Sequence, residues 1–315
     1  MMKNNFLARI VALFCFTICF IQADMSLAQE KELTVGDVIA KHRESIGKSE
    51  ALAKVKLRGI TGKATFAFLQ GGTGSNNDGT FICLSEGKNL GLTMKFSDLN
   101  YPGEYLAYNG KEATVKDMTP GHKSPLADFV FRYNVLVKEG YLGGVLSTAW
   151  PLLGHKEGQP QEFIYKLEQL KDRKYHVLER KTGDLKIKLF FDTKTFHHVR
   201  TEYSVRIKGD TSANSNIRIG EATAESQGVD TSTPGRMSAR APQASIHEAE
   251  PDSIFTLTEK FDRFTDVGGL SIPAAYGIEF SAEGHGTPFV GEWSVFADHW
   301  VNNGAKIDQS FFVAK

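Results

Sequence analysis

The stretch "LTVGDVIAKHRESIGKSEALAKVKLRGITGKATF", residues 33–66, decides the fold class because the spacing of its apolar residues changes within it. Its first half repeats apolar residues at helical spacing and ends at Gly47, where we predict a left-handed helix terminus. Thr34, followed three residues later by Asp37, predicts a capping box at the start of this helix. From Val55 onward the apolar period is two, which is typical of a β-strand.

The two-residue period recurs along much of the remaining chain. Four apolar runs carry it most clearly: Ile60, Ala64, Phe66, Phe68; Leu90, Leu92, Met94, Phe96; Leu185, Ile187, Leu189, Phe191; and Val199, Tyr203, Val205, Ile207. Polar residues fill most alternate positions, which predicts an antiparallel sheet with one face in water. The pair Asn109-Gly110 lies between the segments "YLAY" and "KEATV" and predicts a two-residue hairpin turn.

Residues 124–153 interrupt the strands. Ser124 as a cap and Pro125 at the first helical position predict a helix here. A glycine-broken apolar segment follows and includes Trp150. Two interpretations are open: the segment plugs the core, or it forms a movable cover over a cavity, with its glycines permitting the bending.

The N-terminus has the features of a secretory signal peptide. Lys3 and Arg9 supply positive charge, residues 10–21 form an apolar run, and small residues precede a cleavage position after Ala28. The run is shorter than the ~20 apolar residues that a membrane span needs. We therefore predict that residues 1–28 are removed on export.

Composition excludes several functional classes. Lys plus Arg and Asp plus Glu both number 37, so the chain has no nucleic-acid-binding signature. Cys83 is the one cysteine after the predicted cleavage position, so neither an internal disulfide nor a thiolate metal cluster can form. We predict a buried apolar role for Cys83 and no cofactor.

The nine histidines offer the best argument for catalysis or metal binding, and it is a weak one. His197 and His198 are adjacent on a predicted strand and would point to opposite faces. His299 alternates with apolar residues, and His42 lies beside the apolar stripe of the first helix, where a hydrogen-bonded core role is expected. No hydrolase, zinc-protease, P-loop or dinucleotide motif occurs. We predict no metal site and no enzyme, with an uncharacterised hydrolase as the alternative.

Four features in order resemble the outer-membrane lipoprotein-carrier (LolA/LolB-like) superfamily, particularly its larger secreted lipoprotein-sorting members. They are a first helix leading into a first strand at 38–62, the helix-bearing insertion at 124–153, "LKIKLFFDTKTFHHVRTEY" at 185–203, and "FDRFTDVGGLSIPAAYGIEF" at 261–280. The resemblance covers nearly all of the chain after the signal peptide. It implies an α+β, mainly β fold: a strongly curved antiparallel sheet, or incomplete β-barrel, with helices packed on the concave face.

The same resemblance implies a single periplasmic domain over 29–315. Within it we expect the helical insertion near 124–153 and a flexible loop near 209–245, a segment rich in Gly, Ser, Thr, Ala and Pro. The implied function is binding or carriage of acylated cargo, such as a lipid, a lipopeptide or the acyl chains of a lipoprotein, with transient membrane contact. The alternative is an envelope protein-interaction or sensing module that binds another envelope protein.

The residues expected to line an apolar cavity follow from alternation and helical spacing rather than from a family motif. On the inner sheet face they are Phe66, Phe68, Leu92, Met94 and Phe96, covered by Phe129, Leu142, Leu146 and Trp150. An ordinary filled core is the competing interpretation of the same residues.

Overall fold

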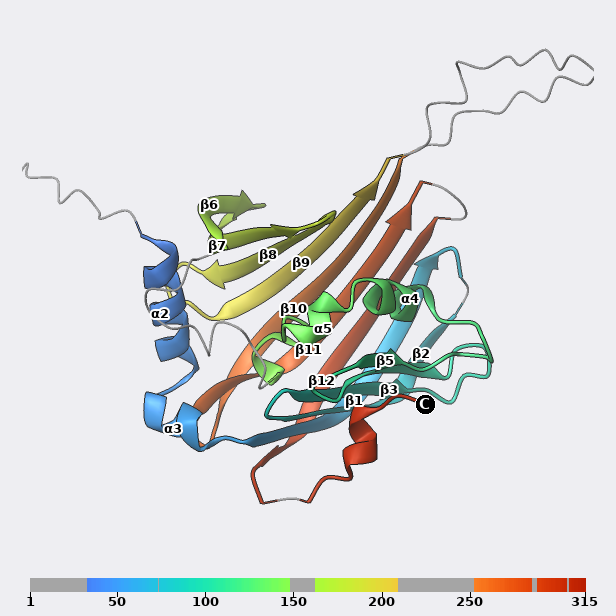
Figure 1. The fold of residues 1–315 in the computed structure, drawn as a ribbon, viewed down its shortest axis with the longest axis horizontal. Helices are drawn as coiled ribbons and strands as arrows, with labels where there is room; N and C mark the ends of the chain where they lie inside the picture. Colours follow the sequence, from blue (N-terminus) through green and yellow to red (C-terminus); the bar gives the residue numbers. More distant parts are fainter. Residues whose placement is uncertain (1–32, 73, 148–161, 209–251, 285–287, 305) are drawn as a thin grey trace, which may run out of the picture.

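The computed structural model describes residues 33–72, 74–147, 162–208, 252–284, 288–304 and 306–315 (Figure 1). Three predictions lie outside this part of the chain: the signal peptide at 1–28, the loop near 209–245, and Trp150 as a cover of the cavity. Within the described residues no helix has both the length and the apolar character needed to cross a membrane.

Twelve antiparallel strands in the described residues form one sheet, as the alternation predicts. Their bounds are β1 Leu57–Gln70, β2 Ser75–Glu86, β3 Asn89–Lys95, β4 Gly103–Tyr108, β5 Ala113–Val115, β6 Ile164–Leu170, β7 Arg173–Thr182, β8 Leu185–Asp192, β9 His198–Ile207, β10 Ser253–Val267, β11 Leu270–Glu283 and β12 Phe289–Asn302. Their spatial order is β5-β4-β3-β2-β1-β12-β11-β10-β9-β8-β7-β6. The edge strands β5 and β6 stand at opposite ends of this order, so the sheet is open.

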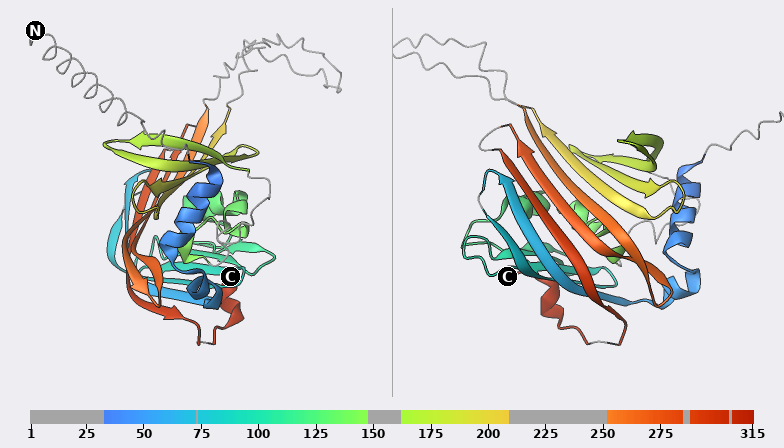
Figure 2. Two further views of the ribbon diagram at one scale, coloured as in Figure 1. Left: turned by 90° about the vertical axis from the view of Figure 1, so that its left-hand side faces the viewer. Right: turned by 180° about the vertical axis from the view of Figure 1, so that it is seen from behind.

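The sheet curves strongly around one concave face (Figure 2). The helical elements are α2 Val35–Ile46, α3 Ser49–Lys54, α4 Pro125–Arg132, α5 Val135–Lys138, and the 3₁₀ turns η1 Gly144–Leu146 and η4 Gln309–Phe312. Helices α4 and α5 lie within the concave face, whereas α2 and α3 stand at one end of the central strands (Figure 1). The predicted fold, a mainly β structure with helices on the concave side, is confirmed.

The first helix begins as predicted and ends differently. The Thr34 hydroxyl accepts a hydrogen bond from the Asp37 backbone N–H over 3.2 Å, and the Asp37 carboxylate accepts one from the Thr34 N–H over 2.8 Å. Gly47 has φ 160° and ψ 173°, so the predicted left-handed terminus is wrong. A Cβ at this position would lie 2.5 Å from the Gly269 carbonyl oxygen and 2.8 Å from Leu270 Cδ2. Gly47 is therefore required for close contact with the β10–β11 turn.

Alternation correctly identifies most of the inner face, with one local exception. Tyr203 and Val205 are buried as expected, but Val199 is only half-buried and His198 is fully buried in its place. The pairing of β8 with β9 shifts by one residue between Phe190 and Phe191. Such an irregularity exchanges the two faces of a strand, which explains why a strict period of two fails here.

The hairpin between β4 and β5 forms at the predicted place with a longer turn. Tyr108 pairs with Ala113, so four residues separate the strands instead of two. The Asn109 side-chain oxygen accepts hydrogen bonds from the backbone N–H groups of Lys111 and Glu112, over 3.0 and 2.8 Å. This side-chain capture stabilises the wider turn.

The insertion that begins at Ser124 packs into the concave face as a plug over its described part. The Ser124 hydroxyl accepts a hydrogen bond from the Ala127 N–H over 2.9 Å, and Pro125 is in the first turn, as predicted. Leu142 and Leu146, beyond the helix, are almost completely buried. Of the two interpretations of this segment, the described residues fit the plug.

Candidate functional site

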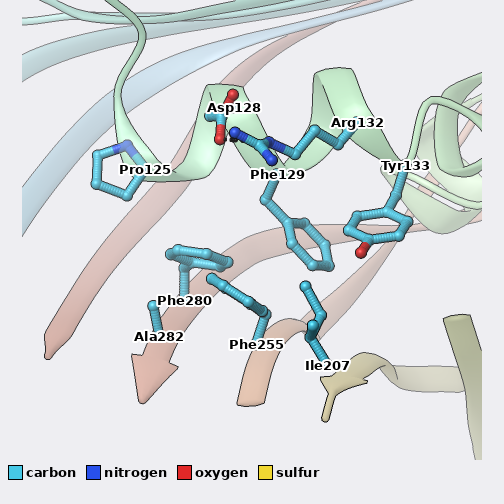
Figure 3. A pocket seen from close by; sticks show the side chains of 9 residues that line it. All are labelled: Pro125, Asp128, Phe129, Arg132, Tyr133, Ile207, Phe255, Phe280 and Ala282. Carbon is cyan, nitrogen blue, oxygen red and sulfur yellow. Dashed lines mark hydrogen bonds and ion pairs between the residues drawn. The ribbon is translucent and has the colours of Figure 1, made fainter. Parts of the chain in front are cut away.

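Two apolar hollows lie at the end of the sheet that is remote from α2 and α3, on either side of Pro125. The first hollow has a volume of about 210 Å³ and is lined by Pro125, Asp128, Phe129, Arg132, Tyr133, Ile207, Phe255, Phe280 and Ala282 (Figure 3). The second has a volume of about 290 Å³ and is lined by Phe68, Gly71, Gly72, Asn100, Tyr101, Met118, Ser124, Pro125, Phe289 and Trp293.

The first hollow lies between α4 and the ends of three strands (Figure 3). Phe129 reaches down from α4 toward the sheet, where its ring centroid is 5.3 Å from that of Phe280 and 6.5 Å from that of Phe255. Ile207, at the end of β9, is 49% exposed and stands at the mouth. The charged pair Asp128 and Arg132, 2.7 Å apart, belongs to successive turns of α4. Its charges are mutually neutralised, so the hollow offers mainly apolar surface.

The second hollow has a polar group in its wall whose hydrogen bonds are already made. The Trp293 indole N–H donates to the Tyr101 hydroxyl over 2.7 Å, and that hydroxyl donates to the Glu104 carboxylate over 2.6 Å. Burial raises the pKa of Glu104 to about 7. Phe68 and Phe289, with ring centroids 5.4 Å apart, supply apolar surface beside this chain of hydrogen bonds.

The two hollows are neighbours. Pro125 lines both of them, and the rings of Phe280 in the first and Phe289 in the second are 6.1 Å apart. We call the two hollows together the two-lobed groove. Most of the residues that line it are apolar, and apolar contact needs no directed polar partner.

The residues predicted to line a cavity divide into two groups. Phe68 lines the second hollow and Phe129 lines the first, while Phe66 packs behind Phe68 with a centroid distance of 4.9 Å. The remaining described residues are packed in the hydrophobic core and line neither hollow: Leu92, Met94, Phe96, Leu142 and Leu146. Trp150 lies outside the described residues.

Sequence reasoning missed most of the groove. The lining includes Phe255 on β10, Phe280 on β11, and Phe289 and Trp293 on β12. The missing information is which strand ends meet α4, because alternation assigns a residue to a face but not to a position along the sheet. An available signal was the clustering of aromatic residues at strand ends, as in Phe255 and Phe289.

A buried carboxylate fixes the plug to the sheet. Glu259 on β10 is fully buried and accepts hydrogen bonds from the hydroxyls of Tyr203 and Tyr276, over 2.6 and 2.5 Å. It also accepts one from the Gly143 backbone N–H over 2.7 Å. Burial raises the pKa of Glu259 to about 7, against the opposing effect of these donors. Because the carboxylate is inaccessible, we assign it a structural role.

Two of the histidines are neighbours in the core, since the ring centroids of His42 and His198 are 6.0 Å apart. His42 is buried, and its Nδ1 lies 3.0 Å from the Phe196 carbonyl oxygen, as expected of a core histidine. His197 contacts the Ser271 hydroxyl over 3.2 Å, whereas His198 contacts the Thr201 hydroxyl over 2.9 Å. In the described ranges, no three His, Cys, Asp or Glu side chains are grouped so that they could hold a metal ion.

Cys83 is buried, as predicted for an apolar role. Burial raises the pKa of its thiol to about 12. The side chain is therefore a thiol and not a nucleophilic thiolate at neutral pH.

No protein-family model and no curated protein matches this chain. Two solved structures share a distant similarity. One is described as "The complex structure of Pseudomonas aeruginosa MucA/MucB", with 9% identity, a TM-score of 0.20, and coverage of 85% of this chain and 99% of that chain. The other is "Crystal structure of MucB in complex with MucA(peri)", with 10% identity, a TM-score of 0.19, and coverage of 86% and 100%. Similarity at this level assigns the chain to no family.

Proposed function

We propose that this protein is a non-catalytic binding protein of the cell envelope that holds an acyl chain in the two-lobed groove. The cargo would be a lipid, a lipopeptide or a lipoprotein, taken up with transient membrane contact. The observation that carries the proposal is the pair of adjoining apolar hollows that share Pro125, in which Trp293 is hydrogen-bonded to Tyr101 and Asp128 is paired with Arg132. The location follows from the predicted signal peptide at 1–28.

The energetics fit reversible carriage. Burial of one methylene contributes roughly 0.8 kcal/mol, so about eight methylenes would contribute ~6 kcal/mol. Association and ordering of the ligand cost several kcal/mol of this gain. The remaining binding free energy for eight methylenes is small, so the acyl chain would exchange readily, and a longer buried chain would be held more tightly.

A test can use substitutions that fill each hollow without removing a core side chain. Ala282→Trp would fill the first hollow and Asn100→Trp the second, since both residues line them. Ala275→Trp is the matched control because it lies on the same strand as Ala282 but on the opposite face. We expect each filling variant to weaken binding of a fluorescent fatty acid, with the control unchanged. If the unmodified protein binds no acyl probe, the proposal is wrong.

A second candidate is binding of an extended segment of an envelope protein, and the open edge of the sheet favours it. Strand β6 is an edge strand, and its Ile164 and Leu167 are 61% and 54% exposed. Exposed strand edges bind extended peptides through backbone hydrogen bonds. Native mass spectrometry of protein purified from its envelope would separate the candidates, since an acyl ligand and a bound polypeptide differ in mass.

A further inference from the structure

Arg58 is a buried cation with few partners. It lies near the start of β1, roughly 33 Å along that strand from Phe68 and the groove. The side chain is 5% exposed, and its Nη2 donates to the Ser147 carbonyl oxygen over 3.0 Å. Among the described residues, nothing accepts a hydrogen bond from its Nε or Nη1, and no carboxylate forms an ion pair with it.

The guanidinium stays charged in this position. Burial lowers the pKa of Arg58 to about 10, which still leaves it protonated at neutral pH. A buried charge is costly unless it is paired and hydrogen-bonded. Its neighbour Cys83 cannot serve as counter-ion, because burial raises the pKa of that thiol to about 12.

The space beside Arg58 is a hollow of about 230 Å³ between the sheet and the first two helices. Its lining is Arg43 of α2, Ser49, Leu52 and Ala53 of α3, Val55, Arg58 and Leu270. The described lining thus includes two arginines and one serine, and no Asp or Glu belongs to it. An adjoining hollow shares Arg43, Ser49 and Leu52 and adds Glu44 and Lys48, whose charges offset each other.

A second unpartnered donor lies on the same face of the sheet. Trp300 on β12 pairs with Ile60, which is two residues from Arg58 on β1. Residues opposite each other, and residues two apart, share a face. The Trp300 indole N–H is buried and has no partner within the described chain. Buried donors without acceptors thus occur at two places on this face of the sheet, and one of them belongs to Arg58, which lines the hollow.

We propose that the hollow beside Arg58 binds an oxyanion, a carboxylate or a phosphate group, through Arg58 with Arg43 as the second cation. Arginine suits this role because its planar fork of N–H donors matches both kinds of group. The apolar walls supplied by Leu52, Val55 and Leu270 fit the short carbon chain of an organic anion. The site is separate from the two-lobed groove, and the proposal does not depend on the proposed function.

The experiment measures thermal melting and calorimetric titration of the full mature chain at constant ionic strength. The probes are sodium phosphate and sodium butyrate, each against sodium chloride. Vesicles of phosphatidylglycerol against phosphatidylcholine form a third arm, which distinguishes a lipid headgroup from a free anion. The variants are Arg58→Met, Arg43→Met and, as an exposed control, Arg206→Met, whose ion pair with Asp252 lies on the surface.

We expect at least one of these oxyanions to raise the melting temperature of the unmodified protein saturably. The rise should vanish in Arg58→Met, shrink in Arg43→Met and persist in Arg206→Met. In chloride alone Arg58→Met should be at least as stable as the unmodified protein, because the substitution removes an uncompensated buried charge. That expectation keeps the test informative even though Arg58 is in the core.

Two results would overturn the proposal. One is the absence of a saturable response to every anion and vesicle, or a response that Arg58→Met leaves unchanged. The other concerns Glu157, the one acidic residue in the segment 148–161, which follows Ser147 in the sequence. If Arg58→Met and Glu157→Gln each destabilise the protein in chloride to the same extent, the counter-ion is part of the chain. Retention of the anion response in Ala282→Trp would show that the site is independent of the groove.

Discussion

Tyr203 and Tyr276, on strands β9 and β11, donate hydrogen bonds to the two different oxygens of one carboxylate, that of Glu259 on the intervening strand β10. The carboxylate also holds the backbone N–H of Gly143, so three strands and the plug meet at one buried group. The Glu259 carboxyl links the packing of the plug to pH, because its charge changes with pH while it remains buried away from water.

The first prediction concerns Glu259→Gln. Burial raises the folded-state pKa of Glu259 from 4.5 to about 7. The protonated form of Glu259 is therefore the form that stabilises the folded state. Its contribution is fully present below pH 4.5 and is lost as pH rises through 7. A difference of this size corresponds to at most about 3 kcal/mol. Between pH 4.5 and 8 the unmodified protein should lose about this much unfolding free energy relative to Glu259→Gln, whose amide does not titrate. Urea titrations at both pH values measure the difference.

Glu104 provides an internal comparison for this measurement. Its pKa is also raised to about 7 by burial, but its hydrogen-bond partners are Tyr101 and Ser124, which line the second hollow. The variant Glu259→Gln should therefore retain the part of the pH dependence that Glu104 supplies. An unchanged pH dependence in Glu259→Gln would show that Glu259 does not titrate in this range.

The second prediction has the opposite sign and concerns His42→Gln. Burial lowers the pKa of His42 from 6.5 to about 4, with smaller effects from its hydrogen bond to Phe196 and from His197. The stability that neutral His42 provides is thus present above pH 6.5 and is lost as pH falls through 4, by at most about 3 kcal/mol. We expect the variant to lose less stability than the unmodified protein between pH 6.5 and 4. Equal losses in both proteins would contradict the prediction.

Sequence alone predicts the local structure of this protein well and its long-range arrangement poorly. The capping box at Thr34, the strand around Leu92 and the helix start at Ser124 all depend on near neighbours, and the structure confirms them. The groove depends on strand β1 lying beside β12, which joins segments more than two hundred residues apart. Nothing in a local pattern fixes that pairing.

Local patterns also leave the reason for a residue open. A glycine after a helix fits a left-handed terminus and fits a close contact equally well, and Gly47 has the second role. Similarly, alternation cannot reveal the register shift at Phe190 and Phe191 that turns His198 inward. The buried arginine at position 58 was not predicted either, because an isolated charge near the start of a strand is usually a solvated one.

The third prediction tests the role of Gly47. In Gly47→Ala the added methyl would meet the Gly269 carbonyl and Leu270, and the backbone can yield only by moving the helix end away from the β10–β11 turn. We expect a loss of ~1–3 kcal/mol in unfolding free energy, as for other overpacked sites. Gly277→Ala is the control, since its nearest new contact would be 3.6 Å away and φ is not left-handed. A tolerated Gly47→Ala would show that the contact is loose.

The last prediction separates core from groove among the residues that the sequence proposed for the cavity. Leu92 is fully buried and lines neither hollow, whereas Phe68 is half-buried and lines the second one. We expect Leu92→Ala to lower the unfolding free energy by about 2–5 kcal/mol, because it leaves a void in a packed core. Its affinity for a fatty-acid probe, measured where the variant is still folded, should be unchanged.

Phe68→Ala should show the reverse balance. Its ring packs against Phe66 and Tyr101 on one side and faces the second hollow on the other, so its removal enlarges an existing space instead of creating a closed void. The stability loss should therefore be smaller than for Leu92→Ala, and the affinity for the probe should fall. Urea unfolding and fluorescence titration of the same samples give both quantities. If Leu92→Ala weakens probe binding more than Phe68→Ala does, the acyl chain occupies the interior of the sheet and the two-lobed groove is not its site.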